Sequence, residues 1–231
     1  MAYVIDAGER EALPVAGTDL TFPVRRVFCV GRNYAEHARE MGHDPDREPP
    51  FFFAKDAAAL TLAREIAYPP ATEDLHHEFE LVVALGTGGE NIPATSVREH
   101  IFGYAVGIDL TRRDLQAEAK RLARPWYLAK SFVDAAPIGP LQPEAAIGHP
   151  RRGRLRLTVN GEMRQDADLA QMIWSIDEMI EILSRHDRLL AGDLVFTGTP
   201  AGVGPVRPGD RMEGEIEGVG RIEVTLTPRR G

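Results

Sequence analysis

A pair of carboxylates inside a strand-like run sets the strongest limit on how this chain can fold. Glu78 and Glu80 stand at the start of the apolar, β-branched run 79–83. Successive side chains of a strand point to opposite faces, so these two side chains share one face. Two like charges held this close repel each other, and a hard divalent cation such as Mg²⁺ or Mn²⁺ would remove the repulsion. The alternative is that the pair lines a solvated strand face or meets Lys and Arg side chains.

A third carboxylate follows at the end of a second apolar run. Asp109 ends the run 102–109, in which the alternate positions Gly103, Ala105 and Gly107 are all small. Small residues let another backbone or a ligand come close, and an acid at the end of a buried strand is costly unless it is paired or ligating. Three carboxylates with coordination positions left over are typical of a catalytic Mg²⁺ site.

The histidines beside the pair leave a second kind of metal site open. His76 and His77 directly precede Glu78. A His combined with a carboxylate is the ligand set of non-haem iron enzymes. Because adjacent residues of a strand point oppositely, at most one of these histidines can face the Glu pair.

Composition narrows the class of protein. The 231 residues carry a net charge of −8, and the only basic run is 151–156, which argues against nucleic acid as a partner. Cys29 is the single cysteine and lies in an apolar run, so we expect a buried, inert thiol and a reducing compartment. The first ten residues include acids where a signal peptide needs an apolar core. No run approaches the ~20 apolar residues of a membrane span, so we expect a cytoplasmic protein without a membrane partner.

Short apolar runs broken by Gly and Pro predict an α+β fold with more strand than helix. Residues 1–26 are predicted to form a small N-terminal lead-in with one or two short strands, and residues 27–231 the catalytic domain. Further strands are expected at 27–30, 51–54, 155–160 and in short pieces within 189–226. Helices are expected at 34–41, where Asn33 would be the N-cap, and at 110–122 and 175–184; residues 137–153 are expected to form a loop. The chain lacks clean strand–helix alternation, which counts against a doubly wound sheet.

The predicted helix 34–41 carries a candidate general base. His37 and Glu40 are three residues apart, so they share a helical face. A carboxylate beside a His fixes its tautomer and stabilises the imidazolium, which suits proton transfer. The alternative is an incidental surface pair. The following loop, 42–50, indicates a mobile lid.

Three further segments offer groups for a substrate. Arg113 and Gln116 are three residues apart on a predicted helix, so they face the same way. Lys130 lies in the apolar run 128–132, where a Lys usually has a partner or a task, although a snorkelling side chain also fits. The Gly/Thr loop 197–204 is no Walker motif; it is suited to hold a small carboxylate or simply to form a tight turn.

In this order, the motifs resemble those of the fumarylacetoacetate hydrolase family. The matching segments are Gly31-Arg32-Asn33-Tyr34-Ala35-Glu36-His37, His77-Glu78-Phe79-Glu80-Leu81, Asp109-Leu110-Thr111-Arg112-Arg113-Asp114-Leu115-Gln116, Pro125-Trp126, Ala129-Lys130-Ser131-Phe132, Val159-Asn160-Gly161-Glu162, Arg164-Gln165 and Thr197-Gly198-Thr199-Pro200-Ala201-Gly202-Val203-Gly204. The resemblance covers the chain from Val27 to its end. Within the family, the segment 36–53 is similar to that of the small acylpyruvate hydrolases that act on fumarylpyruvate.

The resemblance implies a fold, a metal and a set of site residues. The fold would be a twisted, rolled β core with a few helices, assembled as a homodimer with one Mg²⁺ or Mn²⁺ per chain. The implied metal ligands are Glu78, Glu80 and Asp109. The implied catalytic residues are His37, Glu40 and Lys130. The implied substrate contacts are Arg113, Gln116 and Thr199.

The resemblance also implies an activity. It is a metal-dependent hydrolysis of the carbon–carbon bond of an acylpyruvate, a small diketoacid; fumarylpyruvate, split to fumarate and pyruvate in gentisate breakdown, is the expected substrate. The alternative is decarboxylation of oxaloacetate at the same metal site, and a third possibility is a binding protein without catalysis.

Two departures from the family pattern stand out. Lys55 is followed by Asp56 where members commonly have Lys-Pro, and Arg185-His186-Asp187-Arg188 replaces an apolar segment. We expect the first to alter the pocket edge, which makes Lys55 itself uncertain as a site residue, and the second to change only the surface.

Overall fold

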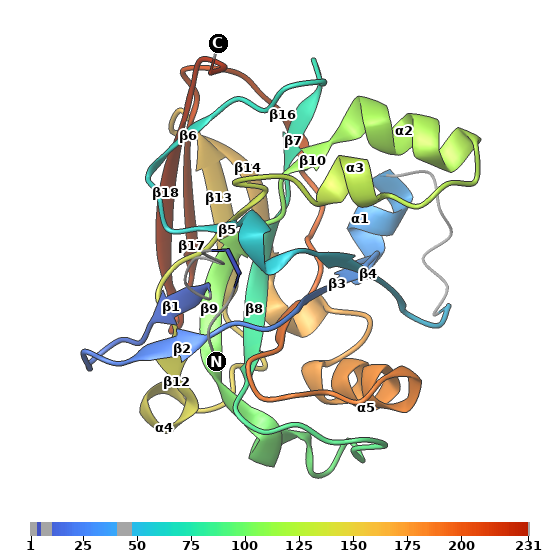
Figure 1. Cartoon of the computed structure of the whole chain (residues 1–231), viewed down its shortest axis with the longest axis vertical. Helices are drawn as coiled ribbons and strands as arrows, with labels where there is room; N and C mark the ends of the chain where they lie inside the picture. The colour runs from blue at the N-terminus through green and yellow to red at the C-terminus, as the bar shows by residue number, and fades with distance from the viewer. Residues whose placement is uncertain (1–3, 6–10, 41–47, 231) are drawn as a thin grey trace.

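Two large β-sheets pack against each other and form most of the molecule (Figure 1). One has six strands in the order β12-β9-β8-β15-β3-β4, and the other has five in the order β14-β13-β17-β18-β6. Small sheets pair β1 with β2, β5 with β11, and β7 with β10 and β16. This computed structural model describes residues 4–5, 11–40 and 48–230. The predicted strand-rich α+β fold is confirmed.

The strands are β1 (Ala12–Pro14), β2 (Thr21–Pro23), β3 (Val27–Gly31), β4 (Phe51–Lys55), β5 (Leu60–Thr61), β6 (Glu65–Ala67), β7 (Leu75–His77), β8 (Phe79–Leu85), β9 (Ile101–Ile108), β10 (Thr111–Arg112), β11 (Ala136–Pro137), β12 (Gln142–Pro143), β13 (Arg154–Val159), β14 (Glu162–Asp168), β15 (Leu194–Phe196), β16 (Gly204–Val206), β17 (Arg211–Ile216) and β18 (Gly220–Thr227). The helices are α1 (Ala35–Glu40), α2 (Arg113–Arg121), α3 (Tyr127–Lys130), α4 (Glu144–Ile147) and α5 (Ile176–His186). None of these helices is long and apolar enough to cross a membrane.

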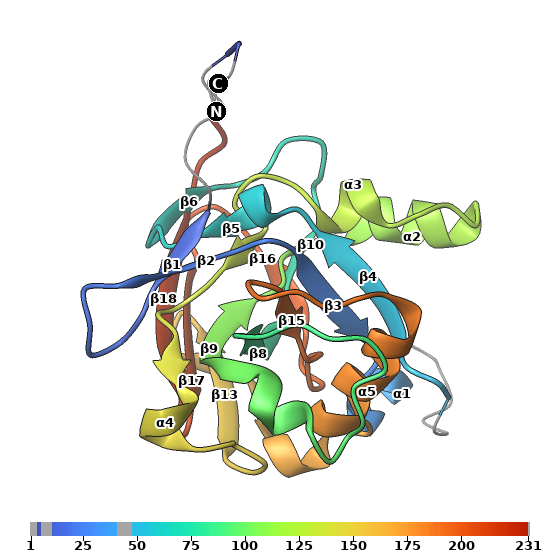
Figure 2. The ribbon, with the colours of Figure 1, turned by 60° about the horizontal axis from the view of Figure 1, so that its bottom comes forward.

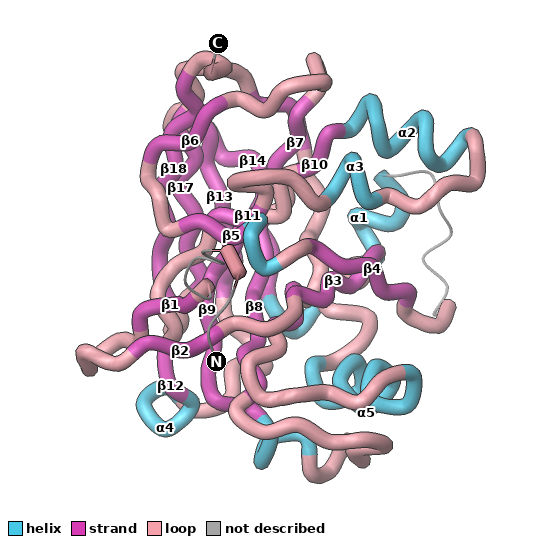
Figure 3. The backbone as a smooth tube through the Cα atoms, in the orientation of Figure 1, coloured by secondary structure: helices cyan, strands magenta, loops and turns pink. Residues whose placement is uncertain are grey.

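The helices gather mainly on one side of the strands. Figure 3 shows α1, α2 and α3 near β3 and β4, the last two strands in the order of the six-stranded sheet, with α5 below them. The longest of them, α5, begins with a capping box in which Ser175 and Glu178 satisfy each other's backbone amides. Seen from a second side, α2 and α3 again lie beside β4 (Figure 2). This end of the molecule carries the candidate site.

Burial explains the order of the core strands. Every residue of β8 is buried, because one face of this strand packs on the five-stranded sheet and the other on the N-terminal strands. Leu13 and Phe22, from β1 and β2, lie in the same apolar cluster as Val82 of β8. The two short strands predicted for residues 1–26 are therefore present, and they pack directly on the large sheet.

The small residues of β9 are required by close packing, as predicted. A Cβ on Gly103 would lie 2.2 Å from the carbonyl oxygen of Gln142, and a Cβ on Gly107 would lie 2.7 Å from the ring of Phe196. Neither neighbour has room to retreat in a close-packed interior. These glycines therefore bring β9 close to its neighbours and fix where Asp109 emerges.

Three predicted elements differ from the structure. The helix expected over 110–122 begins only at Arg113, because the amide of Leu110 donates to Ala135 and residues 111–112 form β10. The loop expected over 137–153 contains β12 and α4, since Gln142 and Pro143 pair with β9. Asn33 does not cap α1; its side-chain amide donates to the carbonyl oxygens of Thr197 and Trp174 instead.

Candidate active site

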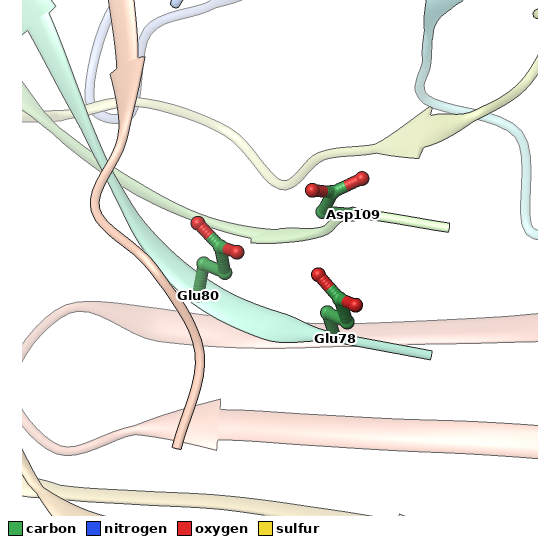
Figure 4. A group of neighbouring side chains, drawn as sticks. All are labelled: Glu78, Glu80 and Asp109. Atoms are coloured by element: carbon green, nitrogen blue, oxygen red, sulfur yellow. The ribbon is translucent and has the colours of Figure 1, made fainter. Parts of the chain in front are cut away.

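Three carboxylates converge where β8 begins and its antiparallel neighbour β9 ends. Glu80 lies in β8 opposite Gly107 of β9, and Asp109 directly follows β9. Glu78 lies in the break between β7 and β8, so it does not share a regular strand face with Glu80 as predicted. The three side chains nevertheless point toward one another (Figure 4), and one ligand oxygen of each lies within 4.8 Å of the others. All three residues are buried.

Lys130 and Arg113 neutralise two of these three acids, Glu78 and Asp109. Lys130 Nζ donates to Glu78 Oε2 at 2.8 Å and to Asp109 Oδ2 at 2.7 Å, and Arg113 donates to Glu78 Oε1 at 2.5 Å. Burial by itself would lower the pKa of Lys130, but the charges of Asp109 and Glu78 outweigh it and raise the pKa. Burial would likewise raise the pKa of Glu78, yet Lys130 and Arg113 hold it well below its usual range. Lys130 is thus a buried, charged partner of two acids rather than a snorkelling side chain.

Lys55 is a second buried lysine beside the three acids, although the sequence left its place in the site uncertain. Its Nζ lies 2.8 Å from Asp109 Oδ1, and both side chains are fully buried. The same nitrogen donates to the carbonyl oxygens of Leu110, Lys130 and Ala135. Lys55 therefore connects β4 to the segments on either side of α2 and α3, and it orients Asp109.

Glu80 is the carboxylate without a cation in the described part of the chain. Its Oε2 accepts a hydrogen bond from the amide of Gly198 at 2.7 Å. Burial, followed by the charges of Asp109 and Glu78, raises the pKa of Glu80 well above its usual range. Asp109 Oδ1 also accepts no well-aligned hydrogen bond within the described structure. Buried carboxylate oxygens with lone pairs to spare fit a hard divalent cation, so the three acids are suited to hold Mg²⁺ or Mn²⁺.

The alternative site built on His76 or His77 does not form in the described structure. His76 Nε2 lies 2.9 Å from Asp74 Oδ1, and His77 Nδ1 lies 3.3 Å from Gln165 Oε1. Burial lowers the pKa of His77 to about 4, so this ring is neutral. Neither histidine joins the group of converging ligand oxygens found among the described residues.

Gln165 is a structural support that the prediction included only as part of a motif. Its Oε1 accepts from the amide of Phe79 at 3.0 Å, and its Nε2 donates to Thr199 Oγ1 at 2.7 Å and to the carbonyl oxygen of Pro200 at 2.9 Å. The side chain is fully buried. It therefore fixes the backbone next to Glu78 against the Gly/Thr loop. In the sequence Gln165 is one of several polar residues in the segment 162–168, so no pattern there predicts its supporting role.

His37 and Glu40 form the pair that their spacing predicts. His37 Nδ1 lies 3.3 Å from Glu40 Oε2, and the Glu40 carboxylate also accepts from the amide of Gly202 at 3.2 Å. The hydrogen bond from His37 is the main cause that lowers the pKa of Glu40. His37 is buried and lines the same cleft as Glu78, Glu80 and Lys130. The contact between His37 and Glu40 is therefore not an incidental surface pair.

The three predicted substrate contacts take different places. Arg113 and Thr199 line the cleft. The Thr199 hydroxyl donates to the carbonyl oxygen of Phe79 at 2.9 Å, so it could only accept a hydrogen bond from a ligand. Gln116 is buried beside the cleft, where its Oε1 accepts from Arg113 at 2.7 Å. Its contact with a substrate would therefore pass through Arg113.

The remaining predictions concern the surroundings of the site. The proposed lid overlaps residues 41–47, which lie outside the described residues. Cys29 is fully buried, as expected. Residues 185–188 are exposed, as expected for a surface change. Asp56 does not line the cleft: its amide donates to Ser131 Oγ at 2.9 Å, a bond that Pro cannot make, and its carboxylate accepts from Ser131 and Tyr127.

A strand-rich fold that gathers three buried carboxylates, a buried Lys and a His–Glu pair at one cleft is typical of a metal-dependent enzyme. Comparison with known proteins defines the family. Residues 26–227 match the model described as fumarylacetoacetate (FAA) hydrolase C-terminal. The chain belongs to the fumarylacetoacetate hydrolase family.

Solved and curated relatives show the range within that family. The crystal structure of fumarylpyruvate hydrolase from Pseudomonas aeruginosa in complex with Mn²⁺ and pyruvate is 51% identical, with a TM-score of 0.97 over 99% of this chain and 100% of that one. The mitochondrial oxaloacetate tautomerase of Mus musculus is 42% identical over 84% of this chain and 88% of its own. The Escherichia coli oxaloacetate tautomerase YcgM is 40% identical over 87% of this chain and 93% of its own.

Proposed function

We propose that this protein hydrolyses an acylpyruvate, with fumarylpyruvate as its expected substrate and fumarate and pyruvate as products. The observation that carries the proposal is the position of the His37–Glu40 pair on the same cleft as the carboxylate group and Lys130. Hydrolysis needs a base for water and a positively charged setting for the diketoacid, and His37 and the cations of this cleft would supply them. Similarity to a fumarylpyruvate hydrolase at 51% identity supports the choice of substrate.

Glu78, Glu80 and Asp109 would hold one Mg²⁺ or Mn²⁺, which supplies positive charge opposite the oxygens of a diketoacid when bound. A Mn²⁺ ion and pyruvate are present in the similar Pseudomonas structure. The buried cations of this chain, Lys130 and Lys55, keep the carboxylates oriented. In this arrangement the three acids would be the metal ligands and Lys55 a support only, whereas Lys130 would both orient the acids and act on the substrate.

His37 would act as the general base of the reaction. Because Nδ1 lies against Glu40, Nε2 is the ring nitrogen that would take a proton from water. The hydroxyl adds to carbon 4 of the diketoacid, the bond between carbons 3 and 4 breaks, and its electron pair remains on the pyruvate fragment as an enolate. The proton on His37 then returns to carbon 3. Lys130, whose charge persists in the buried site, would stabilise the developing negative charge.

The test is turnover by the purified protein with MgCl₂ or MnCl₂. Fumarylpyruvate and acetylpyruvate should both lose their diketone absorbance, and pyruvate should appear in equal amount. EDTA should stop both reactions. Absence of turnover on every acylpyruvate, with metal present, would sink the proposal.

Chemistry on oxaloacetate is the second candidate, because two relatives at 40–42% identity are named oxaloacetate tautomerases. Tautomerisation and decarboxylation of oxaloacetate need no attacking water, so they should depend less on His37 as a base for water. A comparison of kcat/KM for fumarylpyruvate and oxaloacetate in one preparation decides between the candidates. Oxaloacetate decarboxylation, the alternative expected from sequence, is measured in the same assay as pyruvate release.

Assembly as a homodimer and a cytoplasmic location stay predictions. Sedimentation of the purified chain would test the first, and fractionation of its source cells would test the second.

A further inference from the structure

The cleft is lined by two further cations besides Lys130 and Arg113. Arg32, just after β3, and Lys120, in α2, both line it together with Phe51 and Trp126. The Arg32 guanidinium lies 5.3 Å from the centre of the Phe51 ring, and Lys120 Nζ lies 5.2 Å from the centre of the Trp126 ring. Phe51 and Trp126 are themselves in edge-to-face contact at 5.3 Å. Two cations thus flank one aromatic wall.

Neither cation has an acidic partner in the described parts of the chain. The ion pairs of the site bind Arg113 and Lys130 to Glu78, and Lys55 and Lys130 to Asp109. No such pair joins Arg32 or Lys120 among residues 11–40 and 48–230. Burial, together with the charges of Arg113 and Arg32, lowers the pKa of Lys120, which agrees with a local excess of positive charge. Such an excess attracts anions.

The backbone at Arg32 is strained in a way that exposes its side chain to the cleft. Arg32 has φ 59°, a left-handed conformation that costs energy in a residue with a Cβ. The preceding residue is Gly31, where a Cβ would lie 2.0 Å from the Phe51 ring. The glycine therefore admits the ring, and the turn after it directs Arg32 beside that ring. Strain kept at a ligand cleft is commonly functional.

We propose that Arg32 and Lys120 bind a carboxylate at the far end of the acyl group, so that the cleft selects acylpyruvates with a negatively charged acyl part. The inference rests on the proposed function and deepens it. Glu78, Glu80 and Lys130 line the part of the cleft where the diketoacid would sit, and Arg32 and Lys120 line the same cleft without an acid of their own. Arg supplies a planar fork that matches a carboxylate, and Lys supplies a second positive charge. The Phe51 and Trp126 rings line the same cleft beside these cations and suit an unsaturated acyl chain.

The first test compares two substrates that differ at the acyl end. Fumarylpyruvate ends in a carboxylate, and acetylpyruvate ends in a methyl group. In R32Q and K120Q the ratio of kcat/KM for fumarylpyruvate to that for acetylpyruvate should fall roughly 10- to 100-fold, mainly through a higher KM for fumarylpyruvate. R32K keeps a charge and should recover part of the ratio. R121Q removes an exposed charge from the same helix outside the cleft, and should leave the ratio as in the wild type.

The outcomes separate this inference from the proposed function. If both substrates are hydrolysed and the ratio in R32Q and K120Q stays within twofold of the wild type, the subsite is overturned and the proposed function stands. If the wild type hydrolyses neither, the proposed function fails, and binding decides the subsite. Calorimetry with MnCl₂ present should then show that fumarate binds more tightly than crotonate, its monocarboxylate analogue. R32Q should remove that difference; equal affinities in the wild type would overturn the inference.

Discussion

Replacing Glu80 with Gln should separate metal binding from folding. Glu80 accepts a hydrogen bond from Gly198, and Gln keeps both the shape and an oxygen that can accept it. The other two acids already have cations, whereas Glu80 has none among the described residues. The substitution therefore removes a metal ligand without leaving a cation unpaired.

The magnitudes follow from the geometry. Ligand oxygens of the three acids lie within 4.8 Å of one another, and at an effective dielectric constant of ~20 two full charges at that distance repel by about 3 kcal/mol. Burial and the charges of Asp109 and Glu78 raise the pKa of Glu80, so this carboxyl keeps its proton more readily in the metal-free protein, which reduces the repulsion. Gln resembles the protonated acid. In EDTA the free energy of unfolding of E80Q should therefore be at most about 1 kcal/mol below that of the wild type, or exceed it.

With Mn²⁺ present, the wild type should be more stable than E80Q. MnCl₂ at a hundredfold excess over its Kd adds about 2.7 kcal/mol to the folded wild type, which corresponds to a rise in Tm of roughly 5–10 °C for a chain of this size. E80Q should show little of this rise. Thermal and urea unfolding in EDTA and in MnCl₂ measure both effects. A variant that keeps the full stabilisation by Mn²⁺, or that loses more than ~2 kcal/mol in EDTA, would refute the reasoning.

Glu80 also makes the free energy of unfolding depend on pH, and the direction of its pKa shift fixes the sign. The pKa of Glu80 is raised in the folded protein above its ordinary value of 4.5, so the folded chain keeps a proton that the unfolded chain releases. Its contribution to stability is fully present below pH 4.5 and is lost as the pH rises toward the folded pKa. In EDTA the wild type should therefore lose stability relative to E80Q as the pH rises. Mn²⁺ should oppose this trend, because it replaces the proton.

Three further predictions concern other residues. H37A should lower kcat by roughly 10²–10⁴ with Mn²⁺ affinity unchanged, and E40Q should cost less; a near-normal rate in H37A would assign water activation elsewhere. K55M removes a fully buried partner of Asp109 and should lower the free energy of urea unfolding by about 3–5 kcal/mol, whereas a loss under 1 kcal/mol would contradict the buried pairing. Cys29, buried with its pKa raised by burial, should react with iodoacetamide only after unfolding; fast labelling of the native protein would disagree.

Local patterns in the sequence were enough to predict which side chains meet at the candidate site. The two-residue spacing of Glu78 and Glu80, the acid after the small-residue run at Asp109, and the i, i+3 pair of His37 and Glu40 all depend on contacts within one element or at its end. In the structure Glu78, Glu80 and His37 line one cleft, and Asp109 and Glu40 contact these residues from beside it. Strand-rich α+β architecture followed from the same short periodic runs.

Only the tertiary structure decided how those groups are partnered. Lys55 lies far from Asp109 in the sequence, and no spacing rule predicts the buried pair that β4 and the segment after β9 form. Gln165 joins Phe79 to Thr199 across segments that are distant in the sequence. These contacts depend on long-range strand order, which alternation within a single strand does not encode.

The helix after Asp109 shows the same limit in a single segment. Its apolar spacing favoured a start at residue 110, but neighbouring strands and loops take the backbone groups of residues 109–112 before a helix can use them. The sequence thus predicted which acidic and basic side chains would meet at the candidate site, because side-chain type and local period are written along the chain. The shifts of their pKa values, their partners and the presence of Arg32 and Lys120 in the same cleft were decided by folding, because burial and charge proximity arise only when distant segments meet.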